Sequence, residues 1–129
     1  MTLGLSINGN QTRLTTVIEL HRELQSFAGE AFREIWINVK NGPALCALFN
    51  GGIGWLMYLR ESADAGFSSR NPNYEGKVDA MLEYRLNNGE HDTYPASWAL
   101  PETLVIQALE YFVEYQQRAP FIQWHDDSV

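Results

Sequence analysis

The feature that most constrains the fold is a pair of asparagine–glycine turns, Asn41-Gly42 and Asn50-Gly51, in the middle of the chain. They separate three strand-like runs, at residues 34–40, 44–50 and 54–60. Asparagine followed by glycine readily adopts the positive φ angles of tight hairpins, so these runs are expected to be antiparallel neighbours. The sequence therefore predicts an antiparallel meander at the centre of the fold.

Two amphipathic helices are expected to flank this meander. Thr16 stands three residues before Glu19, a spacing at which a hydroxyl and a carboxylate cap a helix start, so a helix is predicted over residues 16–28. Pro101 suits the first position of a second helix, which is predicted to run to about Gln117. The residues expected to be buried recur at spacings of three and four: Val17, Leu20, Leu24, Phe27 and Ala28, then Leu104, Val105, Ala108, Leu109, Phe112 and Val113.

The remaining segments complete the predicted layout. Asn87-Asn88-Gly89 predicts a further hairpin, with strands at about 77–86 and 90–94. The apolar start of the chain suits an edge strand. The apolar residues of segment 61–76 follow neither a helical nor a strand period, which suggests a long loop. The polar tail at His125 is expected to fray. The prediction is one domain over residues 1–129, of the α+β class. Its twisted antiparallel sheet would have five to six strands, with both helices packed on one face.

The charge balance favours some partners over others. Sixteen acidic and nine basic residues give the chain a formal charge of -7. This sign opposes direct binding to nucleic acid or to an anionic membrane and favours a basic partner, although a solvated acidic surface explains it equally well. A single cysteine suits a reducing compartment, and no basic-apolar leader or membrane-spanning run is present. A cytoplasmic location is expected.

The candidate chemical groups do not form a recognisable catalytic or metal-binding pattern. Cys46 lies in an apolar run, where a cysteine usually acts as a small, inert hydrophobe. His91 and Asp92 are neighbours in a predicted strand and would point to opposite faces. His21 is expected on the surface of the first helix, and no pair of residues has zinc-ligand spacing. We therefore expect no enzyme activity, cofactor or metal; a small enzyme that uses Cys46 or His91 is the less favoured alternative.

The predicted loop at residues 61–76 is the first candidate for a contact surface. It combines carboxylates with aromatic rings and an arginine, a mixture typical of the centres of protein interfaces. The sheet face that carries acidic residues would extend this surface. The alternative is that the two aromatic residues plug a small local core. The candidate partner-binding residues are Glu61, Asp64, Phe67, Arg70, Tyr74 and Glu75.

The last third of the chain has a distinctive order of residues. A short strand leads through an aromatic residue and a proline to a Leu-Pro helix start, an Ala-x-x-x-Phe helix, an arginine–proline break and a final tryptophan. With this order, the run from Glu90 to Trp124 resembles the closing motif of immunity protein family one of bacterial polymorphic toxin systems. The matching positions, most of them architectural, are Tyr94, Pro95, Leu100, Pro101, Ala108, Phe112, Arg118, Pro120 and Trp124.

Two positions depart from the family pattern. Ala119 separates the arginine from the proline, and Gln116-Gln117 stand where a glycine often precedes the arginine. Both changes fall in a turn and leave the apolar stripe of the helix intact.

The resemblance implies a role in bacterial competition. A family member would be a small cytoplasmic protein that binds the C-terminal domain of a cognate toxin and blocks its substrate cleft. The toxins paired with this family are commonly nucleic-acid deaminases, in which zinc activates a water molecule, so any zinc would belong to the partner. The alternative from a different class is a small adaptor protein that has no toxin partner.

Overall fold

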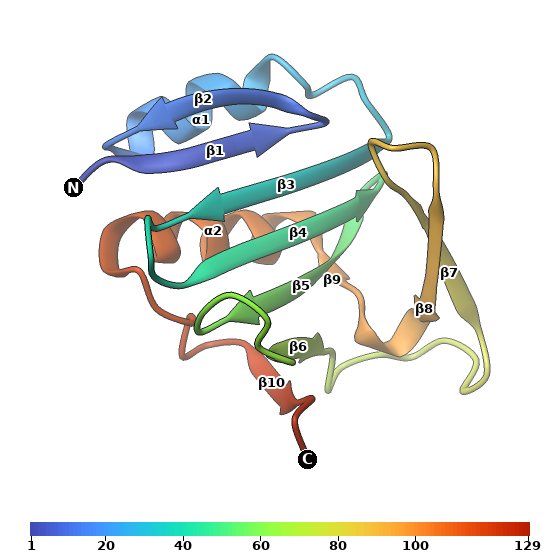
Figure 1. The fold of residues 1–129 in the computed structure, drawn as a ribbon. Helices are drawn as coiled ribbons and strands as arrows, with labels where there is room; N and C mark the ends of the chain where they lie inside the picture. Colours follow the sequence, from blue (N-terminus) through green and yellow to red (C-terminus); the bar gives the residue numbers. More distant parts are fainter.

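The computed structural model describes residues Met1 to Val129, and one large antiparallel sheet runs through the middle of the molecule (Figure 1). The strand order across the sheet is β10-β6-β5-β4-β3-β1-β2, and the short β9 pairs with β5. The sheet remains open, with β2 and β10 at its two edges. Its strands are β1 (Leu3–Ile7), β2 (Asn10–Leu14), β3 (Phe32–Asn38), β4 (Ala44–Asn50), β5 (Ile53–Leu59), β6 (Phe67–Arg70), β9 (Leu100–Pro101) and β10 (Gln123–Asp126).

The central meander β3–β4–β5 confirms the prediction from the asparagine–glycine turns. Each strand pairs antiparallel with the next, and β4 has the predicted bounds. Asn41 and Gly51 hold the positive φ angles that the turns need, +58° and +60°. The local turn chemistry therefore sets the order and direction of these strands.

Four strands of the sheet were not predicted: β2, β6, β10 and the two-residue β9. β2 is a polar run that forms a hairpin with β1, which places β1 inside the sheet and not at its edge as expected. β6 interrupts the predicted loop at 61–76, and β10 includes the tail residue His125 that was expected to fray. These strands lack an alternating apolar pattern because much of their support comes from backbone pairing with neighbours distant in sequence.

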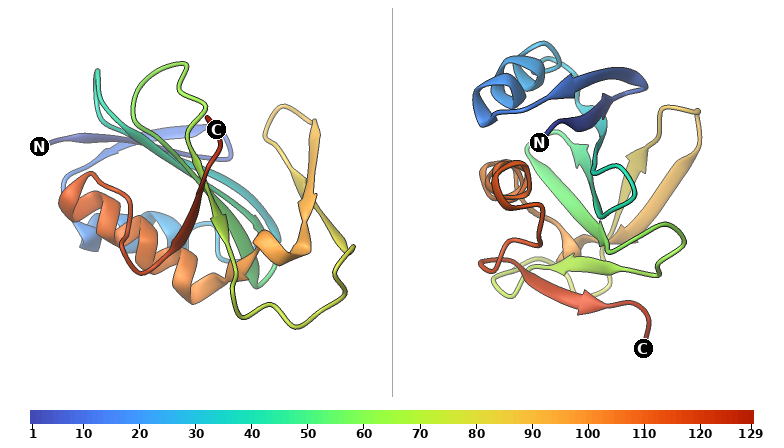
Figure 2. Two further views of the ribbon diagram at one scale, coloured as in Figure 1. Left: turned by 90° about the horizontal axis from the view of Figure 1, so that it is seen from below. Right: turned by 60° about the vertical axis from the view of Figure 1, so that its left-hand side comes forward.

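Helices α1 (Val17–Gln25) and α2 (Glu102–Tyr115) both lie on one face of the sheet, as predicted (Figures 1 and 2). The expected capping box begins α1: Thr16 Oγ1 accepts from the Glu19 N–H at 3.2 Å, and Glu19 Oε1 accepts from the Thr16 N–H at 3.1 Å. Turns replace the last predicted residues of α1, up to Ala28. Neither helix is long and apolar enough to cross a membrane.

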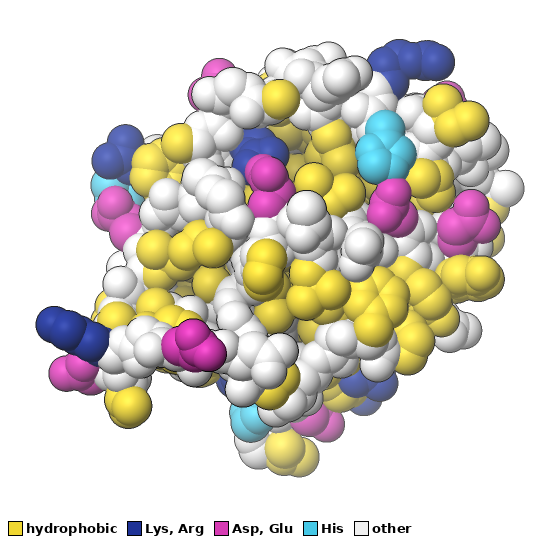
Figure 3. All heavy atoms as spheres, turned by 180° about the vertical axis from the view of Figure 1, so that it is seen from behind, with side chains coloured by type: hydrophobic (Ala, Val, Ile, Leu, Met, Phe, Trp, Pro, Cys, Tyr) yellow, Lys and Arg dark blue, Asp and Glu magenta, His cyan; other side chains and the backbone are white.

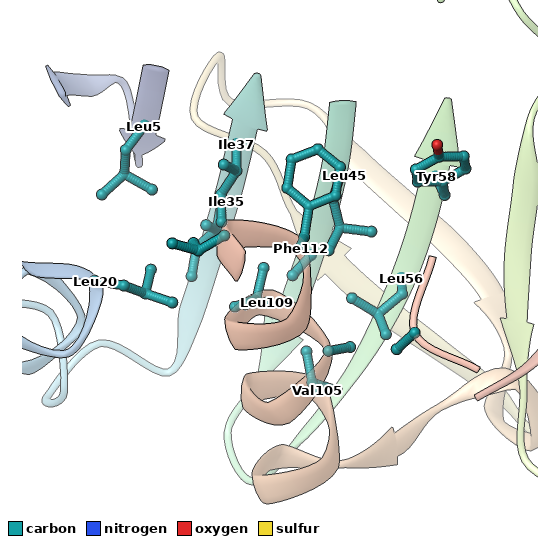
Figure 4. Close-up of a cluster of buried hydrophobic side chains, with 14 of the residues drawn as sticks. Leu5, Leu20, Ile35, Ile37, Leu45, Leu56, Tyr58, Val105, Leu109 and Phe112 are labelled. Atoms are coloured by element: carbon teal, nitrogen blue, oxygen red, sulfur yellow. The ribbon is translucent and has the colours of Figure 1, made fainter. Parts of the chain in front are cut away.

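The main core fills the space between the helices and the sheet (Figure 4). Leu20 of α1 and Leu109 of α2 are fully buried against Ile35 and other side chains of the central strands. The predicted stripe of α2 is buried with one exception, since Leu104 is only partly covered. Packing in this core holds α2 in place on the sheet, together with the segments that contain Leu100 before α2 and Ala119 and Ile122 after it.

The hairpin of β7 (Met81–Arg85) and β8 (His91–Pro95) forms a separate two-stranded sheet on the opposite face (Figure 2). Its formation was predicted, but its inclusion in a single sheet was wrong. Tyr84 and Tyr94 point inward from the hairpin and pack with Trp55 and Cys46 of the large sheet in a second, smaller core. The molecule therefore has three layers: helices, large sheet and hairpin.

Candidate functional site

The six candidate contact residues do not form one surface, because β6 divides them. Glu61 and Asp64 lie before β6, Phe67 and Arg70 are its first and last residues, and Tyr74 and Glu75 follow it. Phe67 is only 8% exposed and belongs to the main core, so it is a packing residue, although not in a small local core with Tyr74. The segment at residues 61–76 that was predicted as one long loop thus contains the strand β6.

Asp64 is engaged with Arg60 at the end of β5. Arg60 donates to the Asp64 carboxylate from Nε at 2.9 Å, from Nη2 at 2.8 Å and from its backbone N–H at 2.9 Å. These hydrogen bonds hold the pKa of Asp64 well below its ordinary value. The carboxylate of Asp64 closes the turn after β5 and is not free to meet a basic partner.

Arg70 is also committed to internal contacts. Its guanidinium lies 3.7 Å from the centre of the Trp98 ring, and Nη1 donates to Ser68 Oγ and to the Ser69 carbonyl at 3.0 and 2.8 Å. Partial burial lowers the pKa of this arginine. The structure uses Arg70 to join β6 to the turn before β9.

The other three candidates are more accessible. Glu61 and Glu75 are exposed, and Tyr74 is half-buried with its hydroxyl donating to the Lys77 carbonyl at 2.8 Å. They lie on different segments, since Glu61 follows β5 whereas Tyr74 and Glu75 belong to the connection from β6 to β7. Each is available to a partner, but the structure does not bring the three together.

The groups considered for catalysis are placed apart from one another. Cys46 is 2% exposed beneath the hairpin, and its burial raises the pKa of the thiol well above the ordinary value, with Glu34 and Asp92 adding to the effect. His91 lies on the outer side of the same hairpin, where Nδ1 is 2.6 Å from Glu83 Oε1. Cys46 and His91 are therefore not arranged as a nucleophile and its base.

The remaining histidines also have acidic neighbours. His21 on α1 pairs with Glu110 on α2, and His125 Nε2 lies 3.7 Å from Asp127 Oδ1. No three histidine, cysteine, aspartate or glutamate side chains come together in a group that could hold a metal ion.

The small core beneath the hairpin contains polar atoms without partners. Trp55 Nε1 and Tyr84 Oη are buried and make no hydrogen bond. The Tyr94 ring stacks on Trp55 with a centroid distance of 4.4 Å, and burial together with Asp92 raises the pKa of Tyr94 to about 12. Trp55 and Tyr84 line none of the five main hollows and are buried in the packed interface between the hairpin and the large sheet.

The hairpin leaves part of its sheet face open, and two adjoining hollows of about 470 and 600 Å³ lie there. Asn38 lines both hollows. Arg13 and Lys40 line the first hollow, and Glu61 lines the second. The expected acidic sheet face is therefore not found at this open area, where cationic side chains outnumber carboxylates. Acidic residues are instead displayed on the hairpin, at Glu83 and Glu90.

An exposed aromatic patch lies on the helical side, where Figure 3 shows hydrophobic side chains gathered across one face of the molecule. We define the aromatic patch as Leu104, Tyr111, Tyr115 and Phe121. Tyr115 is 58% exposed and Phe121 is 48% exposed. Tyr111 contacts both, with ring centroids 4.6 Å from Tyr115 and 6.0 Å from Phe121.

A hollow of about 300 Å³ adjoins the aromatic patch. Leu104 and Phe121 line it together with the start of the β6–β7 connection and the residues before β10. The sequence contains a signal for this surface that the prediction did not use. Tyr111 and Tyr115 are four residues apart on α2 and lie beside the stripe of buried residues, so both fall on one flank of the helix.

The residues that carry the family resemblance occupy mainly structural positions. The Tyr94 ring lies between Trp55 and Trp98, and the side chains of Leu100, Ala108 and Phe112 are buried. Pro95 ends β8, and Pro101 directly precedes α2.

The break after α2 is held by the other motif residues. Arg118 lies 3.7 Å from the centre of the Phe67 ring, and Trp124 Nε1 donates to the Ala119 carbonyl at 2.9 Å across the exposed Pro120. Gln116 adopts the left-handed conformation, with φ of +53°, at the place where a glycine is common in the family pattern. In comparisons with known proteins, no family model matches this chain and no curated protein matches it significantly.

Proposed function

We propose that this protein is an immunity protein that binds a cognate bacterial toxin domain and blocks its substrate cleft. The toxin would be a secreted protein of a polymorphic toxin system, with a C-terminal domain of the nucleic-acid deaminase type. The immunity protein would act in the cytoplasm of the producing cell, without a cofactor and without chemistry of its own.

The observation that carries the proposal is the role of the motif residues between Tyr94 and Trp124. They lie along the segment from β8 through α2 to β10; Leu100, Ala108 and Phe112 are buried in the main core, and Tyr94 packs against the smaller core. The residues that resemble the immunity family are therefore packing residues. Their structural role supports the proposal that this protein shares the scaffold of that family. The step from scaffold to function is the proposal.

Charge and side-chain placement support a binding role. A net charge of -7 speeds association with a basic protein, and a domain that binds nucleic acid presents a basic cleft. The buried thiol of Cys46 and the outward position of His91 favour binding over the alternative of an enzyme that uses these two groups.

The test uses the toxin domain encoded by the neighbouring gene. Equimolar amounts of this domain and the full protein should co-elute as one complex from a size-exclusion column, and co-expression should protect cells from the toxin. Cys46→Ala and His91→Gln should protect as well as the unaltered protein. The absence of a complex, or of any toxin gene alongside, would contradict the proposal and favour the adaptor alternative.

A further inference from the structure

We propose that the free edge of β2 binds an extended acidic segment of the toxin, which would add a strand to the large sheet. This inference rests on the proposed function and adds to it the surface that holds the partner. It places the contact at the outermost strand of the sheet and not at the predicted loop of residues 61–76. An edge of this kind recognises an extended segment through hydrogen bonds to its backbone.

The edge of β2 is uncovered. β2 is the outermost strand on its side of the large sheet, next to β1 (Figure 1). Its first four residues are exposed, and only Leu14 reaches the core. The pairing with β1 is continuous along the strand, without a bulge, and β2 contains no proline. Bulges, prolines and inward-pointing charges commonly protect a sheet edge from pairing, and β2 has none of them.

The turn before β2 determines which of its backbone groups are free. Asn8 and Gly9 form this two-residue turn, with φ of +50° and +83°. Two positive angles are typical of a type I′ hairpin, in which the residues that flank the turn exchange both hydrogen bonds. Ile7 and Asn10 flank the turn here. Every second residue of β2, starting at Asn10, therefore bonds to β1.

The residues between them, Gln11 and Arg13, direct their backbone N–H and C=O groups away from β1. The other side of β1 agrees with this assignment, since the Asn8 N–H donates to the Glu34 carbonyl of β3 at 2.9 Å. That bond belongs to an alternation in which even-numbered residues bond to β3 and odd-numbered residues bond to β2. The outward backbone groups of Gln11 and Arg13 are thus free to bond to an added strand.

The side chains of the same two residues lie on the open face of the sheet. Arg13 lies opposite Gly4 and Gln11 lies opposite Ser6, and all of them line the hollow of about 470 Å³. Lys40 lines the same hollow, and no carboxylate does. Neither Arg13 nor Lys40 forms a salt bridge. This end of the open face is therefore cationic, although the net charge of the chain is -7.

Charge complementarity selects an acidic segment. A strand that pairs with Gln11 and Arg13 would place the opposite side chains on the open face, where a carboxylate meets the Arg13 guanidinium. Glu19, the carboxylate nearest to Arg13 along the chain, is engaged, because its Oε1 accepts from backbone N–H groups at the start of α1. Glu61 follows β5, which β1, β3 and β4 separate from β2. A carboxylate of the partner would therefore find Arg13 unpaired.

Other pairings fit less well. Pairing of β2 with a second copy of itself would bring two Arg13 side chains onto one face, and each chain carries a net charge of -7. At the opposite edge of the sheet, β10 carries Asp126 and is followed by Asp127, which would repel an acidic segment. The Asp127 N–H also donates to the Gly66 carbonyl at 2.9 Å. β2 is thus the edge that suits an acidic partner strand.

The first experiment tests the backbone pairing, by measuring binding of the full protein to the toxin domain encoded by the neighbouring gene. Gln11→Pro removes an outward N–H and leaves the donors that bond to β1 in place. It should raise Kd by about tenfold or more, because a hydrogen bond is lost and a carbonyl of the partner is left unpaired. Gln11→Ala keeps the N–H and should change Kd by less than about threefold. Thermal unfolding verifies that each variant is folded.

A pair of charge reversals tests the choice of an acidic segment. Arg13→Glu should raise Kd by about tenfold or more, since it places like charges opposite each other. Lys77→Glu is the matched control, because Lys77 is exposed, forms no salt bridge and lies in the connection from β6 to β7. It changes the net charge by the same amount and should change Kd by less than about threefold. Equal effects would show that net charge, and not the β2 edge, determines binding.

Amide exchange in the unaltered protein avoids any effect of substitutions on folding. In the free protein, the amides of Gln11 and Arg13 should exchange faster than those of Thr12 and Leu14, which bond to β1. Both fast amides should slow when the toxin domain binds. Binding that leaves both amides fast would overturn the inference. So would slow exchange of both amides in the free protein together with a dimer in sedimentation, because β2 would then pair with a second copy.

The outcomes separate the two proposals. If the unaltered protein binds the toxin domain and Gln11→Pro and Arg13→Glu bind equally well, the location of the interface is wrong and the proposed function stands. If the unaltered protein does not bind, the proposed function fails and the inference fails with it.

Discussion

Arginine side chains lie over aromatic rings at several points in this protein. The Arg33 guanidinium lies 4.2 Å from the centre of the Phe49 ring. The Arg118 guanidinium lies 3.7 Å from the centre of the Phe67 ring, and that of Arg70 lies 3.7 Å from the centre of the Trp98 ring. Contacts of this kind contribute about 0.5–2 kcal/mol each, depending on burial. These contacts give several arginines a packing role, while the excess of sixteen acidic over nine basic residues makes the net charge negative.

The pairing of Asp64 with Arg60 makes a prediction about pH. Because the folded-state pKa of Asp64 is lowered, the pairing stabilises the fold above the unfolded pKa of about 3.9. That stabilisation is lost as the pH falls through the folded value. We expect an NMR titration of the Asp64 carboxyl carbon to show a midpoint clearly below 3.9, the reference value for aspartate.

The matched variant for this titration is Arg60→Gln. It removes the charged side-chain donors but keeps the backbone N–H of residue 60, which also donates to Asp64. The midpoint should move upward toward the reference value without reaching it. An unaltered protein that already titrates at the reference value would show that the pair does not form in solution.

The hairpin of β7 and β8 depends on aromatic stacking for its attachment. Tyr94 stacks on Trp55 and also contacts Trp98 and Tyr84. We expect Tyr94→Ala to lower the free energy of unfolding by about 3 kcal/mol, because it removes a large, partly buried ring and these contacts. Urea denaturation measures the change.

The control for this prediction is Thr93→Ala, which alters an exposed residue on the outer side of the same strand. It should change the free energy of unfolding by no more than about 0.5 kcal/mol. Hydrogen exchange in Tyr94→Ala should speed up for the hairpin amides while β3, β4 and β5 remain protected. Equal losses for the two variants would mean that the ring does not hold the hairpin.

The elements that could be predicted are those whose signals are local. The turn residues at Asn41 and Gly51 defined the meander, the Thr16–Glu19 capping box began α1, and apolar spacing gave both helices. The polar strands β2, β6 and β10 carry no such signal, since they are defined by pairing with strands elsewhere in the chain. The separate layer of the hairpin depends on Trp55 and Tyr94, whose contact is also long-range.

The candidate surface was harder to predict than the fold. The composition of residues 61–76 suggested contacts, but Phe67 and Arg70 are used in packing once β6 forms. The aromatic patch joins Tyr111 and Tyr115 of α2 to Phe121, and only the turn after α2 brings them together. A helical pattern can place two tyrosines on one flank, but it does not show what lies beside them.

The whole molecule is a three-layered body with a net charge of -7, and Tyr115 and Phe121 are among its exposed large apolar side chains. The large sheet is covered by helices on one face and partly by the hairpin on the other, and the patch lies on the helical side (Figures 2 and 3). Long-range attraction would bring a basic partner to this body, and strand pairing at the edge of β2 would hold it. Under the proposed function, inhibition by such a body would be occlusion, and each molecule of the protein would block one molecule of toxin.

The most direct test is a titration of toxin activity. The turnover of the toxin domain encoded by the neighbouring gene is measured while the full protein is added in increasing amounts, at concentrations well above Kd. We expect the toxin activity to fall linearly and to reach zero at an equimolar ratio, independently of incubation time. Progressive loss of activity at a small fraction of an equivalent would contradict it, because the protein would then be acting as a catalyst.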